Sequence, residues 1–157
     1  MFPAILTEAQ QSALGLLSRL SEVRRFYLAG GTALALHLGH RRSRDFDFFA
    51  RREFTPQDLL SHLRTAGEVQ VLQEARGTLT VTIGEIPTSF FHYDYPLLRR
   101  THDSPWGILI ADPADIAAMK LWAIAGRGSR RDFVDLHAYA RAVEGLERVF
   151  ERFREKY

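Results

Sequence analysis

The stretch GGTALALHLGHRRSRDFDFF, residues 30–49, determines the fold that we expect for this chain. Its glycine pair follows the short apolar run FYLA, which is typical of a buried strand. The positions from Thr32 to Leu38 then predict a short helix that ends near Gly39. The segment DFDFFA, residues 45–50, alternates acidic and aromatic side chains with the period of two that a strand requires. A strand, a glycine turn, a short helix and an acidic strand are therefore expected in immediate succession.

The glycine pair has two interpretations. Gly30 and Gly31 carry no Cβ, so backbone N–H groups can approach a phosphate closely, and the N-terminus of the next helix adds partial positive charge. A glycine pair between a strand and a helix can equally be a plain tight turn. The pair alone does not decide between a phosphate site and a turn.

The acidic pair points to a metal ion. Asp45 and Asp47 stand two residues apart on the predicted strand, so their Cα atoms are about 6.5 Å apart and their carboxylates share a face. Phe46 and Phe48 occupy the other face. Magnesium prefers hard oxygen ligands, commonly one or two carboxylates together with water and substrate phosphates. The alternative is a solvated edge strand, in which neighbouring arginines balance the two like charges.

The rest of the chain fits the same fold class. Short helix and strand signals alternate without a repeat or a long linker, which predicts one α/β (α+β) domain over residues 1–157. We expect a small mixed sheet flanked by helices, with a core at about 26–111 and C-terminal helices at about 112–157. The further predicted helices cover about 8–24, from Pro56 onward, 113–125, 130–141 and 144–154, and the further predicted strands form a meander over 69–73, 78–83 and 89–93.

Composition excludes several other classes of protein. The chain has 157 residues, of which 46% are hydrophobic and 25% charged, as in a globular domain rather than a fibrous or disordered one. No apolar run approaches the roughly 20 residues of a membrane span, and no secretory leader is recognisable. Without cysteine there are no disulfides or thiolate metal sites, so a cytoplasmic location is expected. The formal net charge is only +2, but the arginines are clustered, at 41, 42 and 44, at 51 and 52, at 99 and 100, and at 127, 130 and 131.

A second group of candidate residues lies near the C-terminus. Lys120 is one of two lysines in an arginine-rich chain and stands in the otherwise apolar helix IAAMKLWAIA. Its ammonium either snorkels to solvent or acts as a point charge on a phosphate. Asp132 and Asp135 share one face of the next helix. We favour Asp132 for the site, although its place in a first helical turn is an alternative explanation, and Asp135 for helix packing or arginine pairing.

These residues resemble the nucleotidyltransferase superfamily and, within it, the AbiEii/AbiGii-type toxins. The superfamily pattern of a Gly-Gly turn, a short helix and an Asp-x-Asp strand matches Gly30-Gly31 and Asp45-Phe46-Asp47. The subfamily variant Arg-x-Ser-x-Asp-x-Asp matches residues 41–47. The stretch DPADIAAMKLWAIAGRGSRRDFVDLHAY resembles the second block of the family, a lysine helix followed by an Arg-Asp-x-x-Asp helix.

The resemblance implies an enzyme that moves a nucleoside monophosphate from a nucleoside triphosphate to an acceptor hydroxyl and releases pyrophosphate. It implies Mg²⁺ on Asp45 and Asp47, with Mn²⁺ as the alternative ion, and an acceptor such as RNA or tRNA. A cognate antitoxin protein is the implied partner, and no membrane is involved. The predicted catalytic residues are Asp45, Asp47, Lys120 and Asp132, and the predicted nucleotide-binding residues are Gly30, Gly31, Thr32, Ser43, Arg41 and Arg42.

One departure from the superfamily leaves alternatives open. Many nucleotidyltransferases carry a third carboxylate on a later strand, where this chain offers Ser89 or Asp94. A catalytically silent regulatory module of the same fold is therefore the alternative, and an RNA-binding domain without a nucleotide site is a third possibility. Trp122, on the Lys120 helix, is interpreted as a packing residue, with base stacking as its alternative role.

Overall fold

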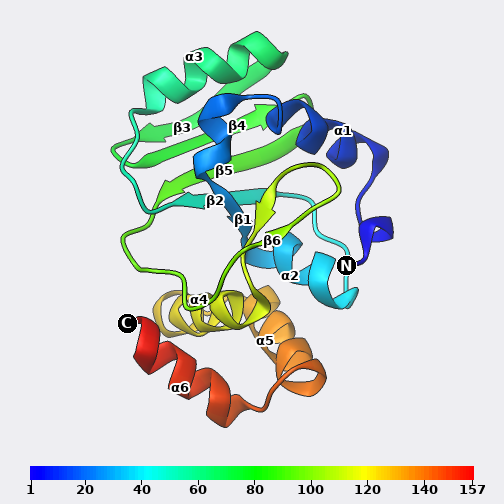
Figure 1. Ribbon diagram of the computed structural model, residues 1–157, viewed down its shortest axis with the longest axis vertical. Coiled ribbons are helices and arrows are strands. Elements are labelled where there is room, and N and C mark those ends of the chain that lie inside the picture. Colours follow the sequence, from blue (N-terminus) through cyan, green and yellow to red (C-terminus); the bar gives the residue numbers. More distant parts are fainter.

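The computed structural model describes all 157 residues and contains one seven-stranded mixed sheet with six α-helices (Figure 1). Two short 3₁₀ turns, Pro3–Ile5 and Ser21–Arg25, flank the first helix. The helices are α1 (Glu8–Leu17), α2 (Gly30–Leu38), α3 (Pro56–Ala66), α4 (Pro113–Gly126), α5 (Arg130–Ala142) and α6 (Leu146–Lys156). The strands are β1 (Tyr27–Ala29), β2 (Phe46–Ala50), β3 (Val69–Ala75), β4 (Thr78–Ile83), β5 (Ile86–His92), β6 (His102–Asp103) and β7 (Leu109–Ile110).

The sheet places the acidic strand at its centre. The strand order is β3-β4-β5-β2-β1-β7-β6, and β3, β4 and β5 form the expected antiparallel meander. Strand β2 runs parallel to β5 and antiparallel to β1, so that Asp47 lies opposite Ala29 on one side and Ser89 on the other. Ala29, the residue just before the glycine turn, and Asp47 are therefore neighbours in the sheet.

One face of the sheet forms the main hydrophobic core. Phe46, Phe48 and Phe90 are fully buried and belong to one hydrophobic core with the buried residues of α1 and α3. The Phe48 and Phe90 rings stack with centroids 5.2 Å apart. Burying an aromatic side chain of this size stabilises a fold by about 1.5–3 kcal/mol, so this face fixes the position of β2 and β5.

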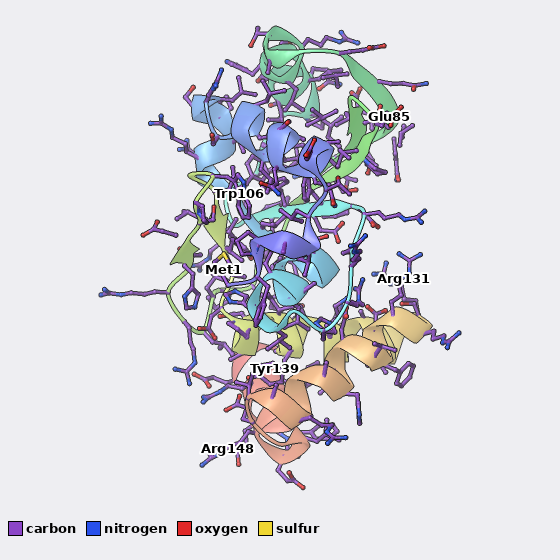
Figure 2. The ribbon with its side chains drawn as sticks, turned by 90° about the vertical axis from the view of Figure 1, so that its right-hand side faces the viewer. Met1, Glu85, Trp106, Arg131, Tyr139 and Arg148 are labelled. Carbon is purple, nitrogen blue, oxygen red and sulfur yellow. The ribbon has the colours of Figure 1, made fainter.

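The opposite face of the sheet presents Asp47, one of the predicted site residues. Asp47 and Phe49 of β2 and Ser89 and Phe91 of β5 are only partly buried there. The C-terminal helices lie below the sheet, with α2 packed between the sheet and α4 and α5 (Figure 1). Figure 2 shows the same layer from the side, with Tyr139 on α5 and Arg148 on α6.

Local signals predicted most elements correctly. The Thr7–Gln10 capping box is present, Asp112 caps α4, and Gly39 closes α2 in the left-handed conformation. The predicted helix over 8–24 is wrong in its second half: the helix stops at Leu17, and a 3₁₀ turn instead carries Val23 into the core. Strand β5 also begins three residues earlier than expected, and β6 was not predicted, because a two-residue strand leaves no periodic pattern.

None of the six helices is both long enough and apolar enough to cross a membrane.

Candidate active site

The glycine turn packs directly against the acidic strand. Gly30 has φ +67°, and a Cβ built on it would lie 2.5 Å from Oδ2 of Asp47. Only glycine combines this left-handed backbone with so close an approach to a carboxylate. Helix α2 begins here without a side-chain cap on Ala29, so its first N–H groups carry uncompensated partial positive charge beside Asp47.

Gly31 has a different reason to be glycine. A Cβ there would overlap the end of the Arg41 guanidinium, and it would lie 3.4 Å from Oδ2 of Asp135. Arg41 uses that space to donate two hydrogen bonds to Asp135, at 2.6 Å and 2.9 Å. Gly31 therefore makes room for an ion pair that joins the α2–β2 loop to α5.

Asp45 and Asp47 are the two carboxylates of the centre that lack protein partners. Neither side chain makes a hydrogen bond or an ion pair, and Thr32 bonds only the backbone carbonyl of Asp45, at 2.5 Å. Burial and, secondarily, the charge of Asp45 raise the pKa of Asp47 to about 6, against opposing effects of Lys120 and Arg127. The charge of two adjacent, unpaired carboxylates in a partly buried setting is neutralised either by a bound cation or by protonation.

Lys120 lies across from these acids and is held by two others. Its ammonium donates to Asp132 at 2.9 Å and lies 2.8 Å from Oδ2 of Asp135. Ser129 also donates to Asp132, at 2.6 Å. Burial raises the pKa of Asp132, but the hydrogen bonds from Lys120 and Ser129 outweigh it, so the net pKa is lowered. Asp132 is thus ionised and fixed in place.

Asp135 connects Lys120 to two other basic residues. It is fully buried and bonds Arg41, Lys120 and Nε2 of His40, the last at 2.8 Å. Burial opposes its ionisation, but these three donors hold its pKa well below the usual range. Asp135 therefore is the arginine-pairing residue that its spacing from Asp132 allowed, and it orients Lys120 through a hydrogen bond.

A pocket of about 430 Å³ joins these groups between the sheet and α4. Four of the predicted site residues line it, namely Gly30, Asp47, Lys120 and Asp132. Its other lining residues are Phe49, Phe91, Tyr93, Ile116, Met119, Trp122, Ala123, Gly126, Arg127 and Tyr157. Three segments distant in the sequence, the glycine turn, the acidic strand and the lysine helix, thus meet in one cavity.

The other predicted site residues lie outside the walls of this pocket. Asp45 immediately precedes β2, next to Asp47, and Gly31 accommodates Arg41. Thr32 is buried and its hydroxyl is already bonded to the carbonyl of Asp45. Ser43 is buried, Arg42 is exposed, and Arg41 is paired with Asp135. Their predicted contacts with a nucleotide remain predictions.

The aromatic wall of the pocket was not predicted from the sequence. Phe49 follows Asp47 by two residues, so strand alternation could have placed it on the acidic face. Tyr93 and Tyr157 are 64 positions apart and bond through their hydroxyls, a contact that no local pattern reveals. Arg127, at the end of α4, also lines the pocket as a further cation.

The position in register with Asp47 on the neighbouring strand is occupied by serine. Ser89 pairs with Asp47 across β2 and β5, and its hydroxyl lies 3.2 Å from that of Thr80 on β4. Asp94 is exposed beyond the end of β5, where His92 bonds it. Glu85 stands at the tip of the β4–β5 hairpin, far from the C-terminal helices (Figure 2). No group of three or more acidic or histidine side chains is arranged to hold a metal.

A larger hollow, of about 780 Å³, lies beside α3. Its walls mix acids and arginines, among them Glu53, which bonds Arg76. Because those charges compensate each other, the smaller pocket with its unpaired acids is the better candidate for an active site.

Comparison with known proteins shows the family of the chain. Residues 13–102 and 94–157 match the family model described as nucleotidyl transferase AbiEii toxin, Type IV TA system. An uncharacterized protein of Aquifex aeolicus (strain VF5) is 42% identical over 134 residues, which cover 83% of this chain and 65% of that relative. The chain thus spans just under two thirds of the length of the curated relative that it matches.

Solved structures share the fold at low sequence identity. The solution structure of the antibiotic-resistance factor ANT(2'')-Ia matches with a TM-score of 0.63 and 14% identity, covering 96% of this chain and 92% of that one. Its crystal structure in complex with adenylyl-2''-tobramycin gives 0.62 and 13%, with 94% and 96% covered. The Megavirus polyadenylate synthase gives 0.58 and 15%, with 88% of this chain and 33% of that one covered.

The turn, the acidic strand and the lysine helix that form the pocket all lie within the segments matched by the family model. The chain belongs to the AbiEii family of nucleotidyl transferase toxins, and its fold is that of a nucleotidyltransferase.

Proposed function

We propose that this chain is a Mg²⁺-dependent nucleotidyltransferase, a single domain that transfers a nucleoside monophosphate from a nucleoside triphosphate to an acceptor hydroxyl. The observation that carries the proposal is the contrast among its acids. Asp132 and Asp135 are saturated with hydrogen bonds, whereas Asp45 and Asp47 have none, although burial raises the pKa of Asp47 to about 6. Their donor set of two carboxylates suits Mg²⁺, with Mn²⁺ as the alternative ion.

Each group of the pocket has a role in this reaction. A magnesium ion on Asp45 and Asp47 would neutralise charge on the phosphates. Gly30 lets the first turn of α2 approach the triphosphate, whose negative charge its free N–H groups favour. Lys120, oriented by Asp132 and Asp135, supplies a fixed positive charge on the opposite wall. Such preorganised charge stabilises the phosphorus centre as the acceptor oxygen attacks and pyrophosphate leaves.

The acceptor and the biological role follow from the family. We propose an RNA such as tRNA as acceptor, recruited by the arginines near the pocket, of which Arg127 lines it and Arg130 and Arg131 begin α5. The chain would then be the toxin of a pair, neutralised by a cognate antitoxin, and would act in the cytoplasm, where nucleotides and RNA are available. The predicted contacts of Gly31, Thr32, Ser43, Arg41 and Arg42 with the nucleotide belong to the same proposal.

Labelled-nucleotide transfer tests the proposal. Purified protein is incubated with each α-labelled triphosphate, MgCl₂ or MnCl₂, and total RNA, and we expect label in the RNA that EDTA abolishes. Asp47→Asn should lower the rate at least a hundredfold, because the cation loses one of two ligands. Asp94→Asn is the matched control: its carboxylate is exposed, lies outside the pocket and should be dispensable.

The same experiment separates the alternatives. Binding of a triphosphate in calorimetry without transfer to any acceptor would favour the silent module, for which the serine in register with Asp47 is the supporting observation. RNA binding that is indifferent to Asp47→Asn, with no triphosphate binding, would favour a plain RNA-binding domain.

A further inference from the structure

Helix α6 carries an apolar stripe that does not coincide with its buried side. The residues of this α6 stripe follow one another at spacings of four, three and four positions, which places them on one side of the helix and its C-cap. They are Leu146, Phe150, Phe153 and Tyr157. The buried side of α6 is formed by Val149 and Lys156, which lie roughly 100° around the helix from the stripe. The fold of the chain therefore leaves part of the α6 stripe uncovered.

Solvent reaches the first half of the α6 stripe. Leu146 is 46% and Phe150 is 49% exposed, and Val143, just before the helix, is exposed as well. Helix α6 packs on α4 and forms the lower edge of the molecule in Figure 1. Exposed apolar side chains that gather in this way mark a contact with another macromolecule.

The second half of the α6 stripe is partly covered by one neighbour. Trp122 of α4 lies 6.2 Å from Phe153 and 4.6 Å from Tyr157, measured between ring centroids. Trp122 packs on these two rings, yet 49% of it remains exposed. The apolar surface therefore continues from α6 onto α4.

Two charged side chains border the α6 stripe without a partner in the chain. Glu147 and Arg154 directly follow Leu146 and Phe153, so both lie along the same edge of the stripe, and both are exposed. The other charged residues of α6 all form ion pairs, namely Arg148 with Glu151, Arg152 with Glu144 and Glu155, and Lys156 with Asp115. One acid and one base of the helix are thus left without a counterion.

We propose that two copies of this chain associate through α6, with the two helices antiparallel across a two-fold axis. In this arrangement Phe150 of each copy packs on Phe153 of the other, and Leu146 packs on Tyr157. The same alignment places Glu147 of each copy beside Arg154 of the other. The register that matches the apolar layers therefore also pairs the two charges that have no counterion within one chain.

A second copy fits the α6 stripe because the stripe is complementary to itself. A two-fold interface brings the same surface together from both subunits, so each contact between two different residues occurs twice. The acid and the base stand on either side of the middle of the stripe and satisfy this condition, whereas two acids or two bases would repel each other. A stable interface buries about 800 Å² per partner, more than one helix face supplies, so we expect a reversible dimer with a dissociation constant of about 1–100 µM.

The proposed contact lies at the rim of the pocket, because Trp122 and Tyr157 also line the pocket. It involves none of the predicted catalytic or nucleotide-binding residues. Association through α6 therefore does not depend on nucleotide transfer, and it can be tested without an activity assay.

Sedimentation equilibrium of the full chain tests the association. Between about 1 µM and about 1 mM, the average mass should rise from that of one chain to that of two. Phe150→Ser should raise the dissociation constant at least about tenfold, because each dimer loses two buried rings. Phe133→Ser is the matched control: Phe133 is similarly exposed, but on α5 and outside the stripe, so its loss should leave the dissociation constant unchanged.

Charge substitutions test the antiparallel alignment. Glu147→Arg alone, or Arg154→Glu alone, brings like charges together twice in each dimer and should weaken the dimer about tenfold. An equimolar mixture of these two variants should dimerise as tightly as the wild type, since each altered side chain then meets an opposite charge on the other variant. Glu155→Arg is the control, because Glu155 is exposed on the far side of α6 from the stripe and should leave the dimer unchanged.

The outcomes decide between this dimer and other contacts. All substituted side chains are exposed, so the variants should fold, which circular dichroism checks. The mass of one chain at every concentration would overturn the proposal and leave the stripe to a different protein. A dimer that the single charge substitutions do not weaken, or that the mixture does not restore, would overturn the pairing through α6.

Discussion

Asp47 is the residue whose charge is least compensated by the fold. Burial and Asp45 raise its pKa from the ordinary 3.8 to about 6. As pH rises between about 4 and 6, the unfolded chain loses this proton before the folded protein does, so the free energy of unfolding falls. Above about pH 6 the loss is complete and constant, and below about pH 4 it is absent.

Replacing Asp47 should therefore stabilise the protein while removing its activity. We expect Asp47→Asn, without added metal, to gain about 1–3 kcal/mol at pH 8 and clearly less at pH 5. Urea denaturation at both pH values measures the gain. MgCl₂ should raise the melting temperature of the wild type but not of the variant. A gain that is the same at both pH values would show that the carboxylate charge is not its source.

Ser89 offers a converse experiment at the same scale. It lies in register with Asp47 on β5, so Ser89→Asp places a third carboxylate beside the acidic pair. Without metal we expect a lower melting temperature, because like charges repel, and a Mg²⁺ concentration for half-maximal stabilisation about tenfold lower than in the wild type.

Thr80→Asp is the control for this experiment. Thr80 faces Ser89 from β4, one strand further from Asp47, so its carboxylate lies too far away to share a cation with the pair. A gain in Mg²⁺ affinity from Thr80→Asp as large as that from Ser89→Asp would contradict the predicted position of the ion.

At the scale of elements, the β1–α2 turn depends on one glycine. Gly30→Ala would put a non-glycine residue at φ +67° and its Cβ 2.5 Å from Oδ2 of Asp47. The strained backbone alone costs about 1–2 kcal/mol, and relief of the contact moves the carboxylate. We expect a lower melting temperature and at least a tenfold loss of nucleotide transfer.

Gly15→Ala provides the comparison. Gly15 lies inside α1, far from the pocket, and no atom lies within 4 Å of a Cβ built there. The substitution should stabilise the protein by about 0.4–1 kcal/mol and leave transfer unchanged. If Gly30→Ala left the melting temperature and nucleotide transfer as unaffected as Gly15→Ala does, the packing of the turn on Asp47 would not be needed for activity.

The elements that sequence could predict are those with local signals. Gly30 and Asp47 stand out through backbone and charge chemistry within one short stretch, and Lys120 through its isolation in an apolar helix. The aromatic wall could not be predicted, because Phe49, Phe91 and Tyr157 come together only when β2, β5 and α6 pack. Likewise, the spacing of Asp132 and Asp135 showed a shared face, but the donors of each carboxylate lie on other elements.

At the scale of the whole molecule, a buried ion pair joins α4 to α6 and bonds the loop that follows β5. Asp115 of α4 accepts hydrogen bonds from Lys156 of α6, at 2.8 Å, and from the backbone N–H groups of Leu98 and Arg99. Lys156 also donates to the carbonyl of Pro96. Both charged side chains are fully buried, so the segment after β5 is tied to α4 and α6 at one point.

Breaking these hydrogen bonds should destabilise the whole fold. It should also loosen the aromatic wall of the pocket, which consists of Phe49, Phe91, Tyr93, Trp122 and Tyr157. Asp115→Ala leaves the buried Lys156 charge without a counterion, bonded only to the carbonyl of Pro96, and leaves the N–H groups of Leu98 and Arg99 without their acceptor, which costs about 3–5 kcal/mol. Lys156→Met keeps the two backbone bonds to Asp115 and should cost less. Because Tyr93 and Tyr157 flank the cluster and bond each other, folded Lys156→Met protein should also bind triphosphate more weakly.

Arg148→Met is the matched control for the buried pair, since it removes an ion pair that is exposed on the same helix. Arg148, which Figure 2 labels on α6, bonds Glu151 at 2.6 Å, and both side chains are more than half exposed. Such pairs contribute about 0–1 kcal/mol. Urea denaturation of the three variants, followed by triphosphate calorimetry, compares them directly. A cost for Lys156→Met no larger than that for Arg148→Met would mean that the buried pair does not hold α4, α6 and the loop after β5 together. The packing of the aromatic side chains alone would then have to fix the position of the aromatic wall.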